Sequence, residues 1–481
     1  MSLDLLDKTT RKQSLSKCDK TSNTNNLSLK KIVALAFVAI LFIILRIEFS
    51  DGPINVDENI APSVARSMVE RGDFNGNWRL AENIMPYFKR DMHNFYSYNL
   101  FAIPFLKPTE NETIAALRSA NIALQLGALA FIWFAMKNGG IAFWRRFYTS
   151  TAIAVLPTMA FDAHLARAES LLYFLAAAVI FVASVNRSVL LRWSLAAFII
   201  GVGTASKLTF AATAIIFLPE GLKLLRNEPT KTIRLLAISA LAMLAGFAAT
   251  SPYTFIEPNV FFDGLGRLMR QYSTQHLPHS NPGTGMLDWA SHLVLFAVGI
   301  SGAACIAIRT PLRSSPNWMI GLSIMASVIY IYFATKPVFF ERNISLALLA
   351  SIIVAFSLPR WRSTNLILTA SLIVMTYWSI NIALLSSSRG SQITEWEINK
   401  FGMAIDRTWP LTGAADLLST CGDRIIGVSD YGDVTSQRIK NEIGIEPMAT
   451  RNGAFSKLPT STLNTYLETS IDYYQCYGGS K

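Results

Sequence analysis

Two neighbouring carboxylates, Asp57 and Glu58, stand a few residues beyond the first long apolar run of the chain, Ile32 to Leu45. In one interpretation they begin a solvated loop and favour the positive N-terminus of the helix that follows. In the other, a carboxylate acts as a general base on an acceptor hydroxyl at the boundary between water and lipid. The second role requires a carboxylate that stays ionised close to the hydrocarbon but outside it.

A second group of polar residues interrupts apolar sequence between residues 161 and 170: Asp162, His164, Arg167, Glu169 and Ser170. An ionisable group at membrane depth costs at least about 2.5 kcal/mol, so such groups usually pair or function. One expectation is a structural turn with an ion pair between Arg167 and Glu169, and the other is a functional cluster. His164 is expected to cap or hydrogen-bond locally rather than to bind a metal.

Three cations interrupt or follow later apolar runs: Lys207, Arg270 and Arg342. Lys207 is costly in apolar sequence unless it meets an anion or reaches the interface along its flexible stem. The two arginines have the geometry to bind phosphate bidentately. The alternatives are a solvated helix face around residue 267 and an ion pair between Arg342 and the adjacent Glu341.

The composition predicts a polytopic membrane protein. The chain has 481 residues, of which 51% are hydrophobic and only 16% are charged, whereas a soluble protein carries about 25% charged residues. The formal charge of +11 is spread between apolar runs without a basic, aromatic-rich face, so nucleic-acid binding is not expected. No Cys/His spacing indicates a metal site, and Cys421 and Cys476 would permit one disulfide in an oxidising compartment.

The expected fold is mainly α, a bundle of about eleven membrane spans with a small α/β domain at the C-terminus. Residues 1–29 are predicted to be a disordered cytoplasmic tail, residues 30–386 the membrane domain and residues 387–481 an extracytoplasmic domain. The first apolar run is interpreted as a retained signal anchor. Later spans are expected at roughly 113–136, 148–163, 169–186, 193–207, 209–226, 233–251, 287–308, 317–335, 343–358 and 364–386.

The long loop between the first two spans, residues 50–112, is predicted to contain two interfacial helices. One covers residues 58–71 at amphipathic spacing and ends at Gly72, and the other covers the aromatic residues 95–106. Aromatic residues in such a loop are more typical of interfacial anchors than of platforms for sugars. In the C-terminal part, strands are expected at Arg424 to Val428 and at Leu463 to Ile471.

Lysine and arginine give the orientation, because cytoplasmic connections are enriched in them. The connections that carry clustered cations are predicted to be cytoplasmic, and they contain Lys137, Arg145, Arg146, Arg187, Arg192, Lys223, Arg226, Lys231, Arg234, Arg309, Arg313, Arg360 and Arg362. The two acidic and polar groups and the three cations described above then fall on or near the opposite, extracytoplasmic side.

This layout resembles the GT-C membrane glycosyltransferases, particularly the superfamily of dolichyl-phosphate-mannose–protein mannosyltransferases and aminoarabinose transferases. The resemblance extends over about residues 30 to 386. It is carried by the acidic pair after the first span, the long first loop, the turn at Arg167 and Glu169, Lys207 after a short span, and Ser-Pro-Tyr at residues 251–253. The family often has a Lys-Pro-Pro-Leu-like segment in the first loop, where this chain has Phe88 to Tyr96, and often an Asp where Glu169 stands.

The resemblance implies transfer of a sugar from a polyprenyl-phosphate donor to a lipid, glycan or protein acceptor, with Asp57 as base and Glu58 or Glu169 as positioning carboxylates. It implies no cofactor, although a divalent metal stays open, and it implies a multi-pass protein of the bacterial inner membrane with a periplasmic active site. The candidates for substrate binding are Arg167, Lys207, Arg270, Arg342, Lys89, Tyr96 and His164.

Two other classes of function stay open on the sequence. A transporter or flippase of lipid-linked saccharides would favour internal repeats and polar sites at the membrane midplane. The sequence shows no repeat, and its ionisable groups gather at one face. An inactive scaffold subunit would tolerate the loss of Asp57.

Overall fold

The computed structural model describes residues 29–47, 58–82, 84, 90–273, 316–336, 341–357, 366, 368–377 and 379–380, and the backbone of six short strands beyond residue 395. The helices are α2 (Leu29–Ile47), α3 (Ile60–Arg71), α4 (Tyr96–Ala102), α5 (Glu110–Asn138), α6 (Phe143–Ala154), α7 (Pro157–Ala163), α8 (Glu169–Ser184), α9 (Val189–Ser206), α10 (Leu218–Asn227), α11 (Pro229–Thr250), α12 (Tyr253–Ile256), α13 (Pro258–Ser273), α15 (Asn317–Ala334) and α16 (Glu341–Ser357). The 3₁₀ helices are η2 (Trp78–Leu80), η3 (Ile103–Phe105) and η4 (Leu208–Phe217).

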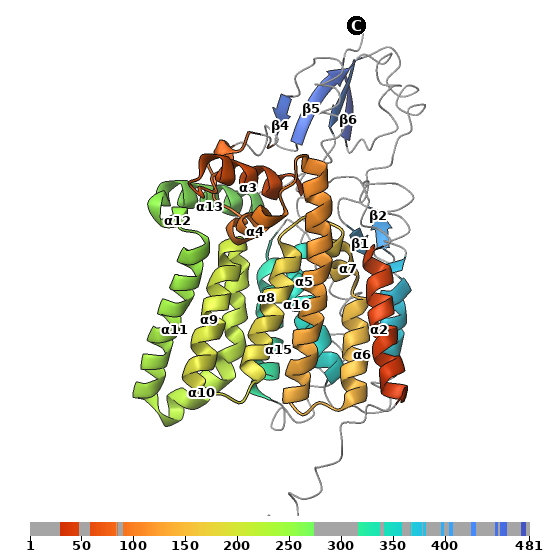
Figure 1. Cartoon of the computed structure of the whole chain (residues 1–481), viewed down its shortest axis with the longest axis vertical. Coiled ribbons are helices and arrows are strands. Elements are labelled where there is room, and N and C mark those ends of the chain that lie inside the picture. Colours follow the sequence, from red (N-terminus) through yellow and green to blue (C-terminus); the bar gives the residue numbers. More distant parts are fainter. Residues whose placement is uncertain are drawn as a thin grey trace, which may run out of the picture.

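Long apolar helices stand side by side and form a bundle (Figure 1). Within the described residues, four helical segments are long and apolar enough to cross a membrane: Glu110–Asn138, Val189–Ser206, Leu208–Asn227 and Pro229–Thr250. Shorter apolar helices cover Glu169–Ser184, Asn317–Phe333, Arg342–Ser357 and Leu368–Tyr377. These helices coincide with spans expected from the sequence. The span expected at 287–308 lies outside the described residues, so the number of spans stays a prediction.

Close backbone packing holds α9 against α11. A Cβ atom added at Gly201 of α9 would lie 2.0 Å from the carbonyl oxygen of Met243 in α11. One added at Gly246 of α11 would lie 2.1 Å from the carbonyl oxygen of Phe198 in α9. These distances leave no room for a side chain, so the approach of the two helices depends on both glycines.

The first loop forms a layer over one end of the bundle, where α3 and α4 lie beside α12 and α13 (Figure 1). The two expected loop helices are confirmed as α3 and as α4 followed by η3, and α3 ends at Gly72, whose φ of 68° is left-handed. Ile60, Val64 and Met68 of α3 pack against Trp78 and Tyr96. The loop therefore has an apolar core of its own.

The clustered cations lie at the opposite end of the bundle from this layer. Lys137 is in the last turn of α5, and Arg145 and Arg146 are in the first turn of α6. Arg192 lies at the start of α9, and α10, which contains Lys223 and Arg226, lies at the same end (Figure 1). The separation of charge expected from the sequence is thus present in the described helices.

The C-terminal part contains strands in two antiparallel sheets. One pairs β1 (Trp396–Ile398) with β2 (Ala404–Asp406), and the other has the order β4 (Met448–Thr450), β5 (Gly453–Leu458), β3 (Ile425–Ser429), β6 (Tyr473–Tyr477). The strand expected at 424–428 is confirmed as β3. The strand expected at 463–471 and the partner cysteine Cys421 lie outside the described residues, and the α/β domain stays a prediction.

Candidate active site

The polar group at residues 161–170 forms a break between two helices. Helix α7 ends at Ala163 and α8 begins at Glu169, and residues 164–168 form a buried turn between them. In the last turn of α7, the carboxylate of Asp162 accepts a hydrogen bond of 2.8 Å from the hydroxyl of Tyr173. Its other oxygen, Oδ1, lies 3.9 Å from Nη2 of Arg167. The expected turn is confirmed, and Asp162 is an ionic partner of Arg167.

A second break brings Lys207 to this turn. Helix α9 ends at Ser206, Lys207 is extended, and η4 follows at Leu208. Nζ of Lys207 lies 3.4 Å from Oε1 of Glu169 and donates to the carbonyl oxygen of Arg342 at 3.3 Å. The cation that the sequence placed in apolar surroundings therefore meets an anion, and three of the predicted site residues from α8, α9–η4 and α16 lie together.

Glu58 joins the first loop to the same turn. Its Oε1 accepts hydrogen bonds from Nε of Arg118 at 2.8 Å and from the backbone N–H of Ala166 at 2.6 Å. Its Oε2 accepts from Nη2 of Arg118 at 2.7 Å. The carboxylate side chain is fully buried and that of Arg118 is only 4% exposed. Asp57, the other member of the acidic pair, lies outside the described residues.

Three polar residues on one face of α5 contact the turn or the elements packed beside it. They are Arg118, Asn121 and Gln125, all buried. Nδ2 of Asn121 donates to the carbonyl oxygen of Leu165 at 2.6 Å, and Nε2 of Gln125 donates to that of Met159 at 2.6 Å. None of the three is among the candidate residues predicted from the sequence. Their signal is present there, because spacings of three and four place polar groups on one stripe of a helix.

The end of α2 also belongs to this network. Nε of Arg46 donates to Oε1 of Gln125 at 2.8 Å, and its Nη1 donates to the carbonyl oxygen of Ala154 at 2.9 Å. Nε2 of His164 donates to the carbonyl oxygen of Leu45 at 3.0 Å. The sequence predicts a local hydrogen bond for His164, but this acceptor belongs to the backbone of α2, 119 residues before it, so the contact is tertiary.

Helix α4 reaches the site through Ser206. The hydroxyl groups of Ser97 and Ser206 are 2.8 Å apart, and the backbone N–H of Tyr98 donates to Oγ of Ser206 at 3.1 Å. The hydroxyl of Tyr98 donates to Oδ1 of Asn121 at 3.2 Å. Contacts from the first loop thus meet both the residue before Lys207 and the polar stripe of α5.

The remaining predicted residues lie elsewhere. The hydroxyl of Tyr96 is engaged within the first loop, where it donates to the carbonyl oxygen of Phe74 and accepts from the backbone N–H of Gly76. Arg270 is exposed in the last turn of α13, and Lys89 lies outside the described residues. Among the residues that the structure does describe, no group of three or more His, Cys, Asp or Glu side chains is placed to hold a metal ion.

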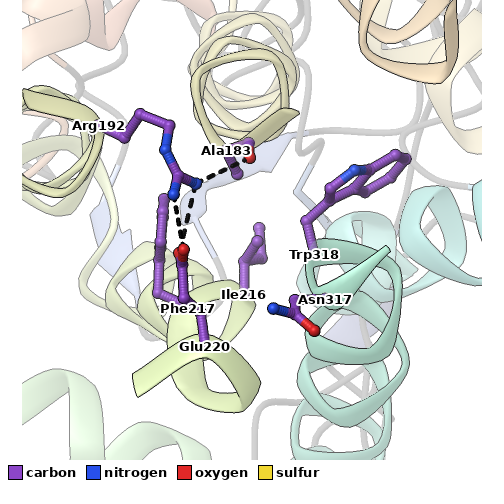
Figure 2. Close-up of a pocket in the computed structure, with 7 residues that line it drawn as sticks. All are labelled: Ala183, Arg192, Ile216, Phe217, Glu220, Asn317 and Trp318. Carbon is purple, nitrogen blue, oxygen red and sulfur yellow. Dashed lines mark hydrogen bonds and ion pairs between the residues drawn. The ribbon is translucent and has the colours of Figure 1, made fainter. Parts of the chain in front are cut away.

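A small cavity of about 140 Å³ lies at the other end of the bundle (Figure 2). Two of its lining residues, Arg192 and Glu220, form an ion pair of 2.6 Å, and Nε1 of Trp193 donates to the same carboxylate at 3.0 Å. Arg192 stands fifteen residues before Lys207, about 22 Å along a helix. The cavity is therefore separate from the polar residues described above.

The first loop is fastened to the segment after α11 by His93. Its Nε2 donates to Oε2 of Glu257 at 3.2 Å, and Nδ2 of Asn75 donates to Oε1 of the same carboxylate at 3.0 Å. Burial lowers the pKa of His93 below its usual value of 6.5, although the Glu257 carboxylate opposes this effect. The imidazole of His93 is therefore protonated less readily in the folded protein than in the unfolded chain.

The pKa of His93 predicts a pH dependence of stability. The contribution of neutral His93 to the free energy of unfolding should be complete above a pH of about 6.5. It should be lost as the pH falls from there through the lowered pKa of His93 in the folded state. His93→Gln keeps a nitrogen donor for Glu257 but does not titrate. We expect the melting temperature of the wild type to fall more than that of His93→Gln between pH 7.5 and 5.5. Parallel curves for the two proteins would contradict this role of His93.

The fold is similar to that of ArnT from Cupriavidus metallidurans, an aminoarabinose transferase of the GT-C superfamily. The crystal structure of ArnT bound to undecaprenyl phosphate aligns with a TM-score of 0.54 at 16% identity, over 76% of this chain and 66% of ArnT. The apo structure aligns with a TM-score of 0.50 at 14% identity, over 76% and 65%. The match thus spans slightly less than two thirds of the length of ArnT. At this identity the likeness shows the overall fold, and the expectation of a fold like that of the aminoarabinose transferases is confirmed.

The other comparisons add little. An oligosaccharyltransferase from Archaeoglobus fulgidus aligns over 75% of this chain and 52% of its own at 11% identity, with a TM-score of 0.46 that is too low to establish a common fold. No protein-family model and no curated protein matches the sequence.

Proposed function

We propose that the protein is a membrane glycosyltransferase that moves a sugar from a polyprenyl-phosphate donor to a lipid, glycan or protein acceptor. The observation that carries the proposal is the contact of the buried Glu169 with the partly buried Lys207, beside Arg342, at one end of a bundle with the GT-C fold. Supporting it, the similar ArnT structure holds undecaprenyl phosphate. The clustered cations at the other end of the bundle favour an extracytoplasmic site. The proposed location is the bacterial inner membrane.

The proposed reaction is a displacement at the anomeric carbon of the sugar. The acceptor hydroxyl attacks this carbon on the face opposite the phosphate, and Asp57 takes the hydroxyl proton. The new glycosidic bond forms as the bond to the phosphate oxygen breaks, and both electrons of that bond leave with the polyprenyl phosphate. The configuration at the anomeric carbon inverts. The leaving phosphate needs charge stabilisation rather than an acid, because it departs as an anion.

Lys207 is the best-placed of the described cations to stabilise that phosphate. Its contacts with Glu169 and with the carbonyl oxygen of Arg342, at 3.4 and 3.3 Å, are long beside the roughly 2.7–2.9 Å of a charge-assisted hydrogen bond. A phosphate oxygen would therefore compete well for the ammonium group. Arg342 and Arg270 are the further candidates for phosphate contacts, Arg342 beside Lys207 and Arg270 on α13.

Transfer itself is testable with radiolabelled polyprenyl-phosphate sugars. Purified protein in nanodiscs is incubated with each labelled donor and with acceptors extracted from native membranes, and the labelled product is identified. Appearance of a covalently linked sugar that depends on the protein supports the proposal. Movement of the intact donor between leaflets of liposomes without a product would indicate a flippase.

Asp57→Asn tests the base. We expect kcat to fall by about 10²- to 10⁴-fold, the usual contribution of general base catalysis, while expression and melting temperature stay close to the wild type. Turnover near the wild-type rate in purified protein would remove Asp57 as the base.

Lys207→Gln tests the phosphate contact. The amide still has a donor for Glu169 but no charge, so we expect KM for the donor to rise about 10- to 100-fold, as for the loss of one hydrogen bond to a charged group. KM for the acceptor should stay unchanged. Lys223→Gln, at the exposed cation end of the bundle, is the matched control and should leave both constants unchanged. An unaltered donor KM in Lys207→Gln would reject the contact.

A further inference from the structure

We infer that Arg118 and Glu58 form a buried clamp that positions the first loop against the turn leading to Glu169, and that Glu58 is a positioning residue rather than a proton donor or acceptor. This inference rests on the proposed function, because it concerns the geometry of the same site. It deepens that proposal by assigning a role to Arg118, which the sequence did not mark as a candidate.

The contacts of Glu58 link three segments that are far apart in the chain. Arg118 lies 60 residues after Glu58 and Ala166 lies 108 residues after it. The fork of the guanidinium meets both carboxylate oxygens, at 2.8 and 2.7 Å, and the backbone N–H of Ala166 shares one of them. Two N–H groups of a planar fork and one of a fixed backbone restrict both the position and the rotation of the carboxylate.

A second residue of α5 holds the same turn. Asn121, one helical turn after Arg118, donates to the carbonyl oxygens of Leu165 and Arg167 at 2.6 and 3.4 Å. The turn is therefore fastened to α5 through Glu58 at Ala166 and directly at the two flanking residues. Glu169 follows three residues after Ala166, so this fastening determines where the carboxylate that faces Lys207 begins its helix.

Stability alone does not account for such a pair. A buried ion pair often contributes no more to stability than apolar residues of similar volume, because both charges lose their hydration. A defined geometry is what the pair provides. In group transfer this geometry matters, since a misplacement of about 1 Å can reduce the rate roughly 100-fold.

Glutamine can replace both Glu58 and Arg118 in a test, because it shares part of its shape with each of these side chains. Glutamine carries an amide nitrogen at the position of Nε in arginine, and it keeps Oε1 of glutamate. The double variant Glu58→Gln/Arg118→Gln therefore retains a donor and an acceptor where Nε meets Oε1, and an acceptor for the N–H of Ala166. Each single variant instead removes the ionic contact between these two side chains while the other charge stays buried.

We expect Glu58→Gln and Arg118→Gln each to lower kcat per folded molecule by about 100-fold, with donor KM within about twofold of the wild type. The double variant should recover to within about tenfold of the wild-type kcat. If Glu58 exchanged a proton with the substrate, both variants that carry Glu58→Gln would stay as inactive as Asp57→Asn, and the inference would be overturned. Melting temperatures and gel filtration give the folded fraction, and Arg118→Lys, which keeps the charge but not the fork, replaces Arg118→Gln if the latter fails to fold.

The controls separate this inference from the proposed function. Absence of transfer by the wild type with every donor would count against the proposed function, and full activity in Asp57→Asn would remove Asp57 as the base. Transfer by the wild type, loss of transfer in Asp57→Asn and unchanged kcat in both single variants would overturn the clamp alone. A purely structural pair would lower the folded fraction but leave kcat per folded molecule unchanged, which also overturns the inference.

Discussion

The structure depends on one constraint, the cost of holding ionisable side chains inside an apolar bundle. Arg46, Glu58, Arg118, Asp162, Arg167 and Glu169 are all buried, and each would be expensive in isolation. The bundle meets this cost with helix breaks. At 164–168 and at Lys207 the chain leaves helical geometry, which frees backbone groups and lets side chains from several helices meet. The polar network is therefore a product of where the helices stop.

Helix α5 has the central place in that network. Its polar stripe contacts α2 and α7 through Gln125 and the first loop through Arg118 and Asn121. It contacts the turn before α8 directly through Asn121, and Arg118 reaches that turn by way of Glu58. One face of a single helix thus fixes elements that come from the first 170 residues of the chain. The remaining surface of α5 is mainly apolar. One face of the helix therefore makes the polar contacts, and the other faces suit an apolar environment.

Much of the fold follows from the sequence, because apolar runs and clustered cations report on spans and their direction without knowledge of packing. The loop helices and the end of α3 at Gly72 are predicted for similarly local reasons. The partners of the charges were not predictable, because pairing is decided by tertiary contacts. Lys207 pairs with Glu169, 38 residues before it, and Arg118 pairs with Glu58, 60 residues before it. Arg118 stands out in the sequence as an arginine within an apolar span. Its partner, however, could be identified only once the position of the first loop was known.

Arg46 gives the first helix a significance beyond attachment to a bilayer. Its guanidinium is fully buried, lies over the ring of Phe42 and supplies hydrogen bonds to Gln125 and to the carbonyl oxygen that α6 leaves open at Ala154. An unrelated anchor of equal length and hydrophobicity would leave these acceptors without their donor. Helix α2 is thus part of the packed interior of the protein, and a membrane anchor of unrelated sequence could not replace it.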